Sequence, residues 1–166
     1  MKNLFLVGFM GCGKSTVGRA VATLRACGFV DLDDQIESRE KMEISRIFEE
    51  RGEPYYREIE TRVLTTLDLS PPKVVALGGG TFTFPRNIEY VRSQGISLFL
   101  DCPLDLLRMR CETFQHRPLF LRDPVKLADL FYARLPFYRC ADYRVEVSDA
   151  PPEDVARRIV NLLEKI

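Results

Sequence analysis

One segment near the start of the chain carries the pattern of a phosphate-binding loop. Residues Gly8 to Ser15, the phosphate loop below, read GFMGCGKS and match G-x-x-x-x-G-K-[ST]. Glycines let successive backbone N–H groups turn toward a β-phosphate, and the N-terminus of the following helix adds its dipole. Lys14 would reach the β and γ oxygens, and Ser15 would ligate Mg²⁺. The segment predicts nucleoside triphosphate binding, and a purely structural glycine turn is the weaker interpretation.

Two carboxylates, Asp31 and Asp33, follow the second short apolar run. At the end of a strand, residues two apart point to the same side, so both could face one site. Beside a phosphate loop, one could hold Mg²⁺ or its water, and the other could accept a proton from an attacking hydroxyl. Asp33 or Asp34 could instead cap the next helix. The phosphate loop makes us favour the site.

Two later features could contact a small ligand. Gly78-Gly79-Gly80 comes directly after a buried-type strand, where it either lets a ligand approach the backbone closely or forms a tight turn. Arg57 could bind an anion, or it could merely pair with Glu53 or Glu60 along its helix. Taken alone, each feature leaves both interpretations open.

Two further arginines lie in the second half of the chain. Arg117 belongs to a polar, basic stretch from Thr113 to Pro124, which predicts a surface loop; it could close over phosphates or remain a solvated charge. Arg134 precedes Pro136, and a proline inside a helical pattern marks a kink as readily as a site. His116 is the only histidine, and we interpret it as a loop residue rather than a base or metal ligand.

The composition limits the class of protein. The chain has 166 residues, 24 basic and 24 acidic side chains and 46% hydrophobic residues, as is typical of one soluble domain. A formal net charge of zero gives no field for holding nucleic acid or an anionic membrane. Together with the absence of any long apolar patch, it favours a monomer. No apolar stretch is long enough to span a bilayer. Five cysteines without CxxC spacing favour a cytoplasmic protein with reduced thiols.

Alternating strands and helices must position these residues. Short apolar runs predict strands at Asn3–Val7, Phe29–Leu32, Val74–Leu77, Ile96–Leu100 and residues 143–147. Helical spacing predicts helices over residues 14–25, within the charged block up to about 69, between the later strands, over 125–139 with a break at Pro136, and over 153–165. This α/β alternation predicts a parallel sheet with helices on both faces and a ligand site at the carboxyl ends of the strands.

Together, the order and spacing of these segments resemble the shikimate kinase family along nearly the whole chain. The matching pieces are GxxGxGKS at Gly8–Ser15, DxD at Asp31 and Asp33, YRxxE at Tyr56–Glu60, GGG at Gly78–Gly80, RPL at Arg117–Leu119 and RxPxY at Arg134–Tyr138. The first piece alone would indicate only a P-loop NTPase, whereas the ordered set is highly specific.

The resemblance implies transfer of the ATP γ-phosphoryl group to the 3-hydroxyl of shikimate, with Mg²⁺ as cofactor, in the pathway to chorismate and the aromatic amino acids. It also implies one domain over residues 1–166 with a nucleoside monophosphate kinase-like fold. That fold has five parallel strands in the order 2-3-1-4-5, a substrate-binding helical region at about 33–61 and a mobile lid at about 112–124.

The resemblance further implies a role for each matching residue. The catalytic residues would be Lys14, Asp33 and Arg117. The nucleotide would contact Gly11, Cys12, Gly13, Lys14, Ser15, Thr16, Arg110 and Arg117, the metal Ser15 and Asp31, and shikimate Asp33, Arg57, Gly78, Gly79, Gly80 and Arg134. The chemistry agrees independently, because shikimate is a small carboxylate and guanidinium groups bind carboxylates bidentately.

The chain also departs from the family pattern. Tyr56 replaces the first aromatic residue of the usual FR dipeptide, and Cys12 occupies a variable loop position that could make the protein sensitive to thiol reagents. Two alternatives are another small-metabolite kinase, such as gluconate kinase, and a catalytically silent nucleotide-binding module. The DxD and GGG motifs and Arg134 weigh against the first. Five retained residues weigh against the second: Lys14, Ser15, Asp31, Asp33 and Arg117.

Overall fold

A computed structural model describes residues 1–113 and 123–165, and five strands within them form one parallel sheet. The strands are β1 (Asn3–Val7), β2 (Gly28–Asp31), β3 (Lys73–Ala76), β4 (Gly95–Asp101) and β5 (Tyr143–Glu146). They lie in the order β2-β3-β1-β4-β5, and every neighbouring pair is parallel. The predicted strand order is confirmed.

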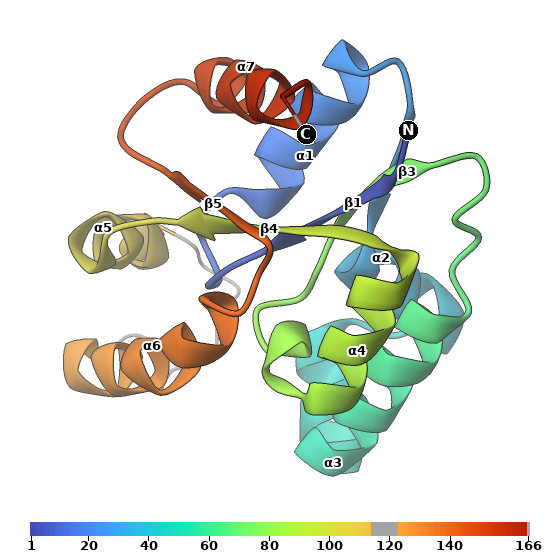
Figure 1. Ribbon diagram of the computed structural model, residues 1–166. Coiled ribbons are helices and arrows are strands. Elements are labelled where there is room, and N and C mark those ends of the chain that lie inside the picture. The colour runs from blue at the N-terminus through green and yellow to red at the C-terminus, as the bar shows by residue number, and fades with distance from the viewer. Residues whose placement is uncertain (114–122, 166) are drawn as a thin grey trace.

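Helices cover both faces of this sheet (Figure 1). They are α1 (Lys14–Leu24), α2 (Leu32–Glu40), α3 (Ile44–Thr65), α4 (Pro85–Gln94), α5 (Leu104–Thr113), α6 (Pro124–Tyr138) and α7 (Pro152–Leu163), with a short 3₁₀ helix, η1 (Thr81–Thr83). The helices α1 and α7 contact each other on one face, and α4 packs against β4 from the other. Among the described residues, no helix is both long enough and apolar enough to cross a membrane.

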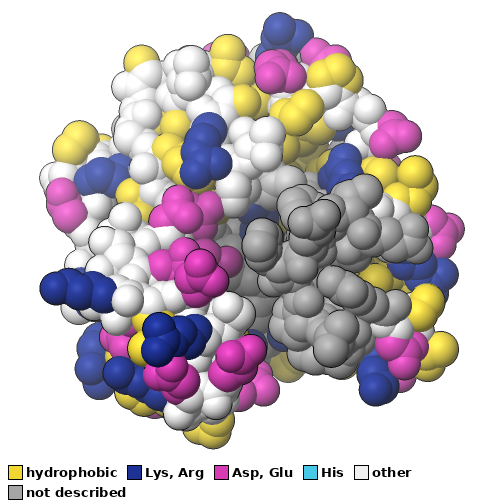
Figure 2. Space-filling model, turned by 180° about the vertical axis from the view of Figure 1, so that it is seen from behind, with side chains coloured by type: hydrophobic (Ala, Val, Ile, Leu, Met, Phe, Trp, Pro, Cys, Tyr) yellow, Lys and Arg dark blue, Asp and Glu magenta, His cyan; other side chains and the backbone are white. Residues whose placement is uncertain are grey.

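Burial explains the sequence patterns of the strands. Residues Leu4 to Val7 of the central strand β1 are at most 1% exposed, because helices cover both faces, and the strand therefore reads as a continuous apolar run. On the edge strand β5, buried Val145 alternates with exposed Arg144 and Glu146. Figure 2 shows acidic and basic side chains interspersed over one face of the molecule.

Two differences from the sequence prediction have a physical cause in the structure. The strand β2 ends at Asp31, and Leu32 already starts α2, because the Asp31 side chain accepts a hydrogen bond from the Asp33 amide and caps the helix. The break expected at Pro136 is absent, since α6 continues to Tyr138. A proline removes one hydrogen bond near the helix end, and burial of Tyr138, 0% exposed, holds the last turn in place.

The helix α3 has a bend in its first half. Gly52 has φ 79° and ψ 169°, which are not helical values, and Pro54 follows inside the helix. Proline is well tolerated at a helix start, so the second part of α3 begins anew just after Gly52. The rings of Phe48 and Tyr56, one from each part, pack with centroids 4.5 Å apart. The bend thus joins two short helical pieces that contact each other.

Candidate active site

The phosphate loop connects β1 to α1 at the carboxyl edge of the sheet, as predicted. Its glycines Gly8, Gly11 and Gly13 have φ values of 148°, 80° and 97°, which other residues rarely adopt. The Lys14 ammonium lies against the loop and donates hydrogen bonds to the carbonyls of Gly8 at 2.8 Å and Phe9 at 3.0 Å. The loop therefore places a cation beside a helix N-terminus, an arrangement suited to polyphosphate binding.

Other predicted nucleotide contacts border the same loop. Cys12 is buried, and its amide donates to the Phe9 carbonyl at 3.3 Å, so the thiol that was considered as a target for reagents is not exposed in this structure. Arg110 of α5 donates to the Gly11 carbonyl at 3.3 Å, which brings a second cation to the loop. Thr16 lies exposed in the first turn of α1.

Ser15 and Asp31 form the oxygen pair predicted to hold a metal. The Ser15 hydroxyl donates to Asp31 Oδ2 at 2.5 Å, and the other oxygen of Asp31 caps α2 at 3.1 Å from the Asp33 amide. Hydroxyl and carboxylate oxygens are ligands that Mg²⁺ accepts, and this ion usually keeps waters and phosphate oxygens as its other ligands. The donor chemistry of this pair therefore fits Mg²⁺.

Asp33 lies in the first turn of α2 rather than at the end of a strand, so the strand-alternation argument for it was wrong. It nevertheless lies close to Asp31 and Lys14, whose charges act on it. Its Oδ1 atom is buried without a hydrogen-bond partner among the described residues. Burial, followed by the charge of Asp31, raises the pKa of Asp33 to about 6, although Lys14 opposes the shift. A carboxylate of this kind can take a proton near neutral pH.

Arg57 is held by two carboxylates of its own helix. It donates to Glu60 at 2.9 Å and to Glu53 at 3.1 and 3.2 Å, so both helix pairings considered from the sequence are present. Its side chain is only 12% exposed, and its guanidinium carbon lies 5.1 Å from the centre of the Tyr56 ring. Arg57 is therefore a fixed, partly buried cation and not a solvated surface charge.

A series of buried, hydrogen-bonded polar groups holds the Glu60 partner of Arg57 in place. Glu60 is 0% exposed and also accepts a hydrogen bond from the Thr81 hydroxyl at 2.6 Å. The Thr81 carbonyl accepts from the Asn87 side chain at 2.9 Å. Sequence reasoning missed Thr81 and Asn87, because the contact between Glu60 and Thr81 spans 21 positions and leaves no local pattern.

The Gly78–Gly80 turn packs tightly against these side chains. A Cβ atom at Gly78 would lie 2.9 Å from Asp33 Oδ1, and one at Gly80 would lie 2.6 Å from Arg57 Nη1. Real Cβ contacts are not this short, so only glycine fits both positions without displacing the charged groups. At Gly79 the corresponding position is 3.5 Å from Arg134 Nη1. The turn thus brings together Asp33, Arg57 and Arg134.

Arg134 approaches this turn from α6. Its guanidinium carbon lies 5.9 Å from the centre of the Phe9 ring, and Phe9 in turn packs edge-on against Phe131, with centroids 5.5 Å apart. The phosphate loop and α6 therefore meet at Phe9. We call Asp33, Arg57, Gly78–Gly80 and Arg134 the acceptor cluster, since the structure brings together all the residues predicted to contact the second substrate.

Two predictions concern residues outside the described part of the chain. Arg117 and His116 fall there, as does most of the lid predicted at about 112–124. Their expected roles stay predictions from the sequence.

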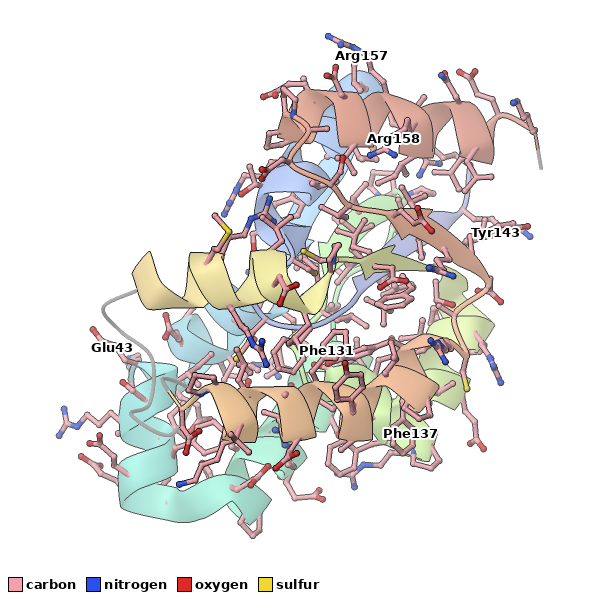
Figure 3. All side chains as sticks on the ribbon, turned by 90° about the vertical axis from the view of Figure 1, so that its left-hand side faces the viewer. Glu43, Phe131, Phe137, Tyr143, Arg157 and Arg158 are labelled. Atoms are coloured by element: carbon pink, nitrogen blue, oxygen red, sulfur yellow. The ribbon has the colours of Figure 1, made fainter. Side chains whose placement is uncertain are left out.

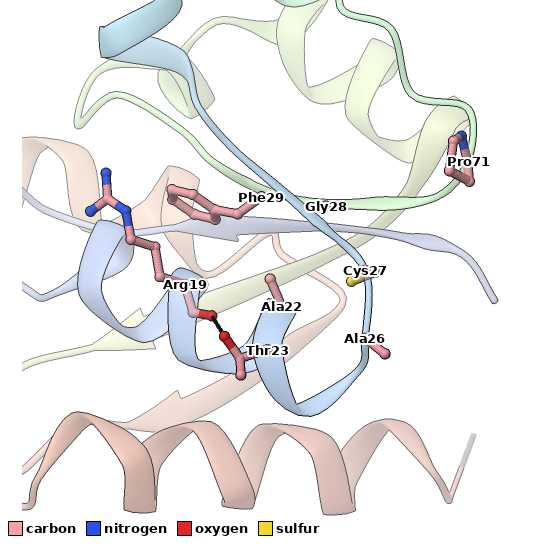
Figure 4. Close-up of a pocket in the computed structure, with 8 residues that line it drawn as sticks. All are labelled: Arg19, Ala22, Thr23, Ala26, Cys27, Gly28, Phe29 and Pro71. Carbon is pink, nitrogen blue, oxygen red and sulfur yellow. Dashed lines mark hydrogen bonds between the residues drawn. The ribbon is translucent and has the colours of Figure 1, made fainter.

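A shallow pocket at α1 and β2 shares no residue with the phosphate loop or the acceptor cluster. It is lined by Arg19, Ala22, Thr23, Ala26, Cys27, Gly28, Phe29 and Pro71 (Figure 4). The Arg19 guanidinium lies 4.9 Å from the Phe29 ring centre, and the Thr23 hydroxyl donates to the Arg19 carbonyl at 3.0 Å. These polar groups have partners within the protein, and the pocket adds nothing to the chemistry above.

Comparison with known proteins decides the family. The family model described as shikimate kinase matches residues 10–164. The chain belongs to the shikimate kinase family. A shikimate kinase from Caldanaerobacter subterraneus subsp. tengcongensis is 37% identical, and the alignment covers 100% of this chain and 98% of that protein. The family expected from the motifs is confirmed.

Solved structures agree with this family assignment. A shikimate kinase from Acinetobacter baumannii in complex with shikimate matches with a TM-score of 0.92 and 38% identity, covering 99% of this chain and 94% of that one. A gluconokinase from Sinorhizobium meliloti matches with a TM-score of 0.57 and 18% identity, covering 99% of this chain and 92% of that one. The likeness to gluconokinase extends to the fold alone.

Proposed function

We infer that the protein is an ATP-dependent shikimate kinase, which forms shikimate 3-phosphate and ADP. One observation carries the chemistry: the unpartnered carboxylate oxygen of Asp33 faces the glycine turn between the phosphate loop and two arginines. Family membership over residues 10–164 supports this substrate. This activity belongs to the pathway to chorismate and the aromatic amino acids, as the resemblance implies.

Asp33 is proposed to accept the proton of the attacking hydroxyl. The 3-hydroxyl oxygen forms a bond to the γ-phosphorus, the bond from that phosphorus to the β–γ bridging oxygen breaks, and ADP leaves with the electron pair. The hydroxyl proton moves to the Asp33 carboxylate. Because its pKa is raised to about 6, Asp33 is ionised at neutral pH and is a stronger base than an ordinary aspartate.

Two arginines are proposed to hold the shikimate carboxylate. Arg57 of α3 and Arg134 of α6 approach the glycine turn from two different helices. Gly80 lies beside Arg57, and Gly79 lies beside Arg134. Planar guanidinium groups suit a carboxylate. Closeness of the glycine backbone then lets the ring of the acceptor approach Asp33.

On the nucleotide side, the phosphate loop is proposed to bind the ATP phosphates through its backbone amides and Lys14, with Arg110 beside it. Ser15 and Asp31 would hold Mg²⁺, and their close oxygen pair supports this. Bound there, the ion would neutralise charge on the β- and γ-phosphate oxygens. Lys14 can leave its two loop carbonyls to contact phosphate oxygens, exchanging neutral acceptors for charged ones.

We further propose one catalytic domain that acts as a cytoplasmic monomer, with residues 33–61 as its acceptor-binding helical region and with no nucleic acid or membrane partner. The net charge of zero and the five cysteines without CxxC spacing support this proposal. Light scattering during gel filtration measures the oligomeric state, and a dimer would contradict the monomer.

A coupled assay of ADP release tests the activity. Reactions contain ATP and Mg²⁺ with shikimate, with gluconate, or with no acceptor. We expect release with shikimate to exceed release in the other two reactions by at least about two orders of magnitude, since only the right acceptor completes the site. Equal release with and without shikimate would contradict the proposal, and a preference for gluconate would establish the alternative kinase.

A further inference from the structure

Tyr138 lies on the inner face of α6, directly behind the acceptor cluster. Leu127, Phe131, Arg134 and Tyr138 recur at helical spacing on that face, and in Figure 3 Phe131 points from α6 toward the protein interior whereas Phe137 lies on the outer side. The Tyr138 side chain is 0% exposed. Its ring packs against Phe99 of β4 with centroids 5.5 Å apart, so the ring alone would already make Tyr138 a good core residue.

The hydroxyl of Tyr138 makes polar contacts in addition to the packing of its ring in the core. It donates a hydrogen bond to the Gly79 carbonyl, and the Arg134 guanidinium lies close enough for its charge to act on the phenol. Burial raises the pKa of the Tyr138 phenol, which keeps its proton available for the carbonyl. One buried oxygen thus links the acceptor turn to an arginine of the acceptor cluster.

We propose that Tyr138 is a positioning residue for the acceptor, which fixes both the Gly79–Gly80 peptide and the Arg134 guanidinium. This inference rests on the proposed shikimate kinase activity. In a planar trans peptide the C=O and the next N–H point in opposite directions. Holding the Gly79 carbonyl toward Tyr138 therefore turns the Gly80 N–H away from α6. That amide belongs to the residue whose Cβ position lies 2.6 Å from Arg57.

The second contact restricts Arg134. The Arg134 guanidinium carbon lies 5.9 Å from the centre of the Phe9 ring and beside the Tyr138 hydroxyl, and these neighbours limit the rotamers that this long side chain can adopt. A preorganised arginine loses less conformational entropy when a carboxylate binds. Tyr138 would therefore raise affinity for shikimate without touching the nucleotide.

The variant Tyr138→Phe removes the hydroxyl and leaves the ring on Phe99. We expect the KM for shikimate to rise by about tenfold, the usual cost of one buried hydrogen bond, with the KM for ATP within twofold. Tyr132→Phe is the matched control, since Tyr132 lies on the same helix and is 60% exposed. This control should leave both constants unchanged.

A double-mutant cycle separates positioning from simple packing. If Tyr138 acts through Arg134, then Tyr138→Phe should raise the shikimate KM much less in an Arg134→Lys background than in the wild type. An unchanged shikimate KM in Tyr138→Phe would overturn the proposal, and so would parallel rises of both KM values with a lower melting temperature. Absence of shikimate turnover in the wild type would instead overturn the proposed function, and this inference with it.

Discussion

The phosphate loop and the acceptor cluster are built in opposite ways. The loop comes from one continuous segment, and its ammonium bonds to carbonyls five and six positions away. The acceptor cluster takes residues from α2, α3, the turn after β3 and α6, and one of its side chains, Arg57, is held by ion pairs. Loop variants should therefore change nucleotide use and turnover, whereas variants of the acceptor cluster should separate shikimate binding from ATP binding.

Lys14→Met is expected to have the largest effect. The substitution removes a cation that would stabilise the negative charge of the transferred phosphoryl group. It should therefore lower kcat by at least about 10²-fold. Shikimate binding, measured by calorimetry without nucleotide, should change little. Turnover within threefold of the wild type would contradict the assignment of the phosphate loop. A matched loss of shikimate affinity would show that the two regions are not separable.

Asp33→Asn keeps the shape of the side chain but removes the base. We expect kcat to fall by roughly 10²-fold, the usual contribution of general base catalysis, while the Kd for ATP stays within a few fold. In the wild type, kcat/KM for shikimate should rise with pH through about 6, where Asp33 loses its proton. Lost ATP binding with retained shikimate binding would mean that Asp31 and Asp33 have exchanged roles.

The same substitution should stabilise the fold. The pKa of Asp33 is raised from 3.8 to about 6 in the folded protein, so the folded state holds its proton more tightly than the unfolded chain. The contribution of Asp33 to the free energy of unfolding is therefore fully present below about pH 4. It falls as the pH rises to about 6 and is absent above that pH. Urea unfolding at pH 7.5 should show Asp33→Asn to be more stable than the wild type by roughly 1–2 kcal/mol. The difference should shrink at pH 4.5, and a difference independent of pH would contradict the raised pKa.

Arg57→Lys tests the acceptor cluster alone. A lysine keeps the charge but loses the planar fork, so the shikimate KM should rise about tenfold and the ATP KM should stay nearly constant. Arg51→Lys is the control. Arg51 lies on the same helix, and its side chain, which forms an ion pair with Glu40, is 43% exposed. Equal rises of both KM values for Arg57→Lys would assign this residue to the fold instead.

Gly80→Ala should have the smallest effect. The new methyl group would lie 2.6 Å from Arg57 Nη1, and the far end of that side chain can move away. We expect a several-fold rise in shikimate KM with a nearly unchanged melting temperature. The control Gly28→Ala would meet only the Lys73 side chain at 3.3 Å. An unaltered shikimate KM in Gly80→Ala would show that the turn does not place Arg57.

The comparison also explains which features the sequence could predict. The phosphate loop, the strands and their order follow from contiguous patterns or from the ordered motifs of a family. Arg57 and Arg134 were found, but their supports were not, since Thr81 and Tyr138 act across 21 and 59 positions. The strand argument for Asp33 failed because a cap decided by Asp31 ended β2 early. Hydrogen bonds that span the fold leave no periodicity for a sequence to show.

The bend at Gly52 bears on how such an enzyme can change over evolutionary time. Its φ of 79° lets the chain restart a helix, so the residues before it need not share an axis with those after it. Contact between the two parts passes through Phe48 and Tyr56, while the ion pair of Arg57 with Glu60 lies wholly in the second part. Mutation can therefore change the first part of α3 without shifting the register of Arg57 and Glu60 in the second part.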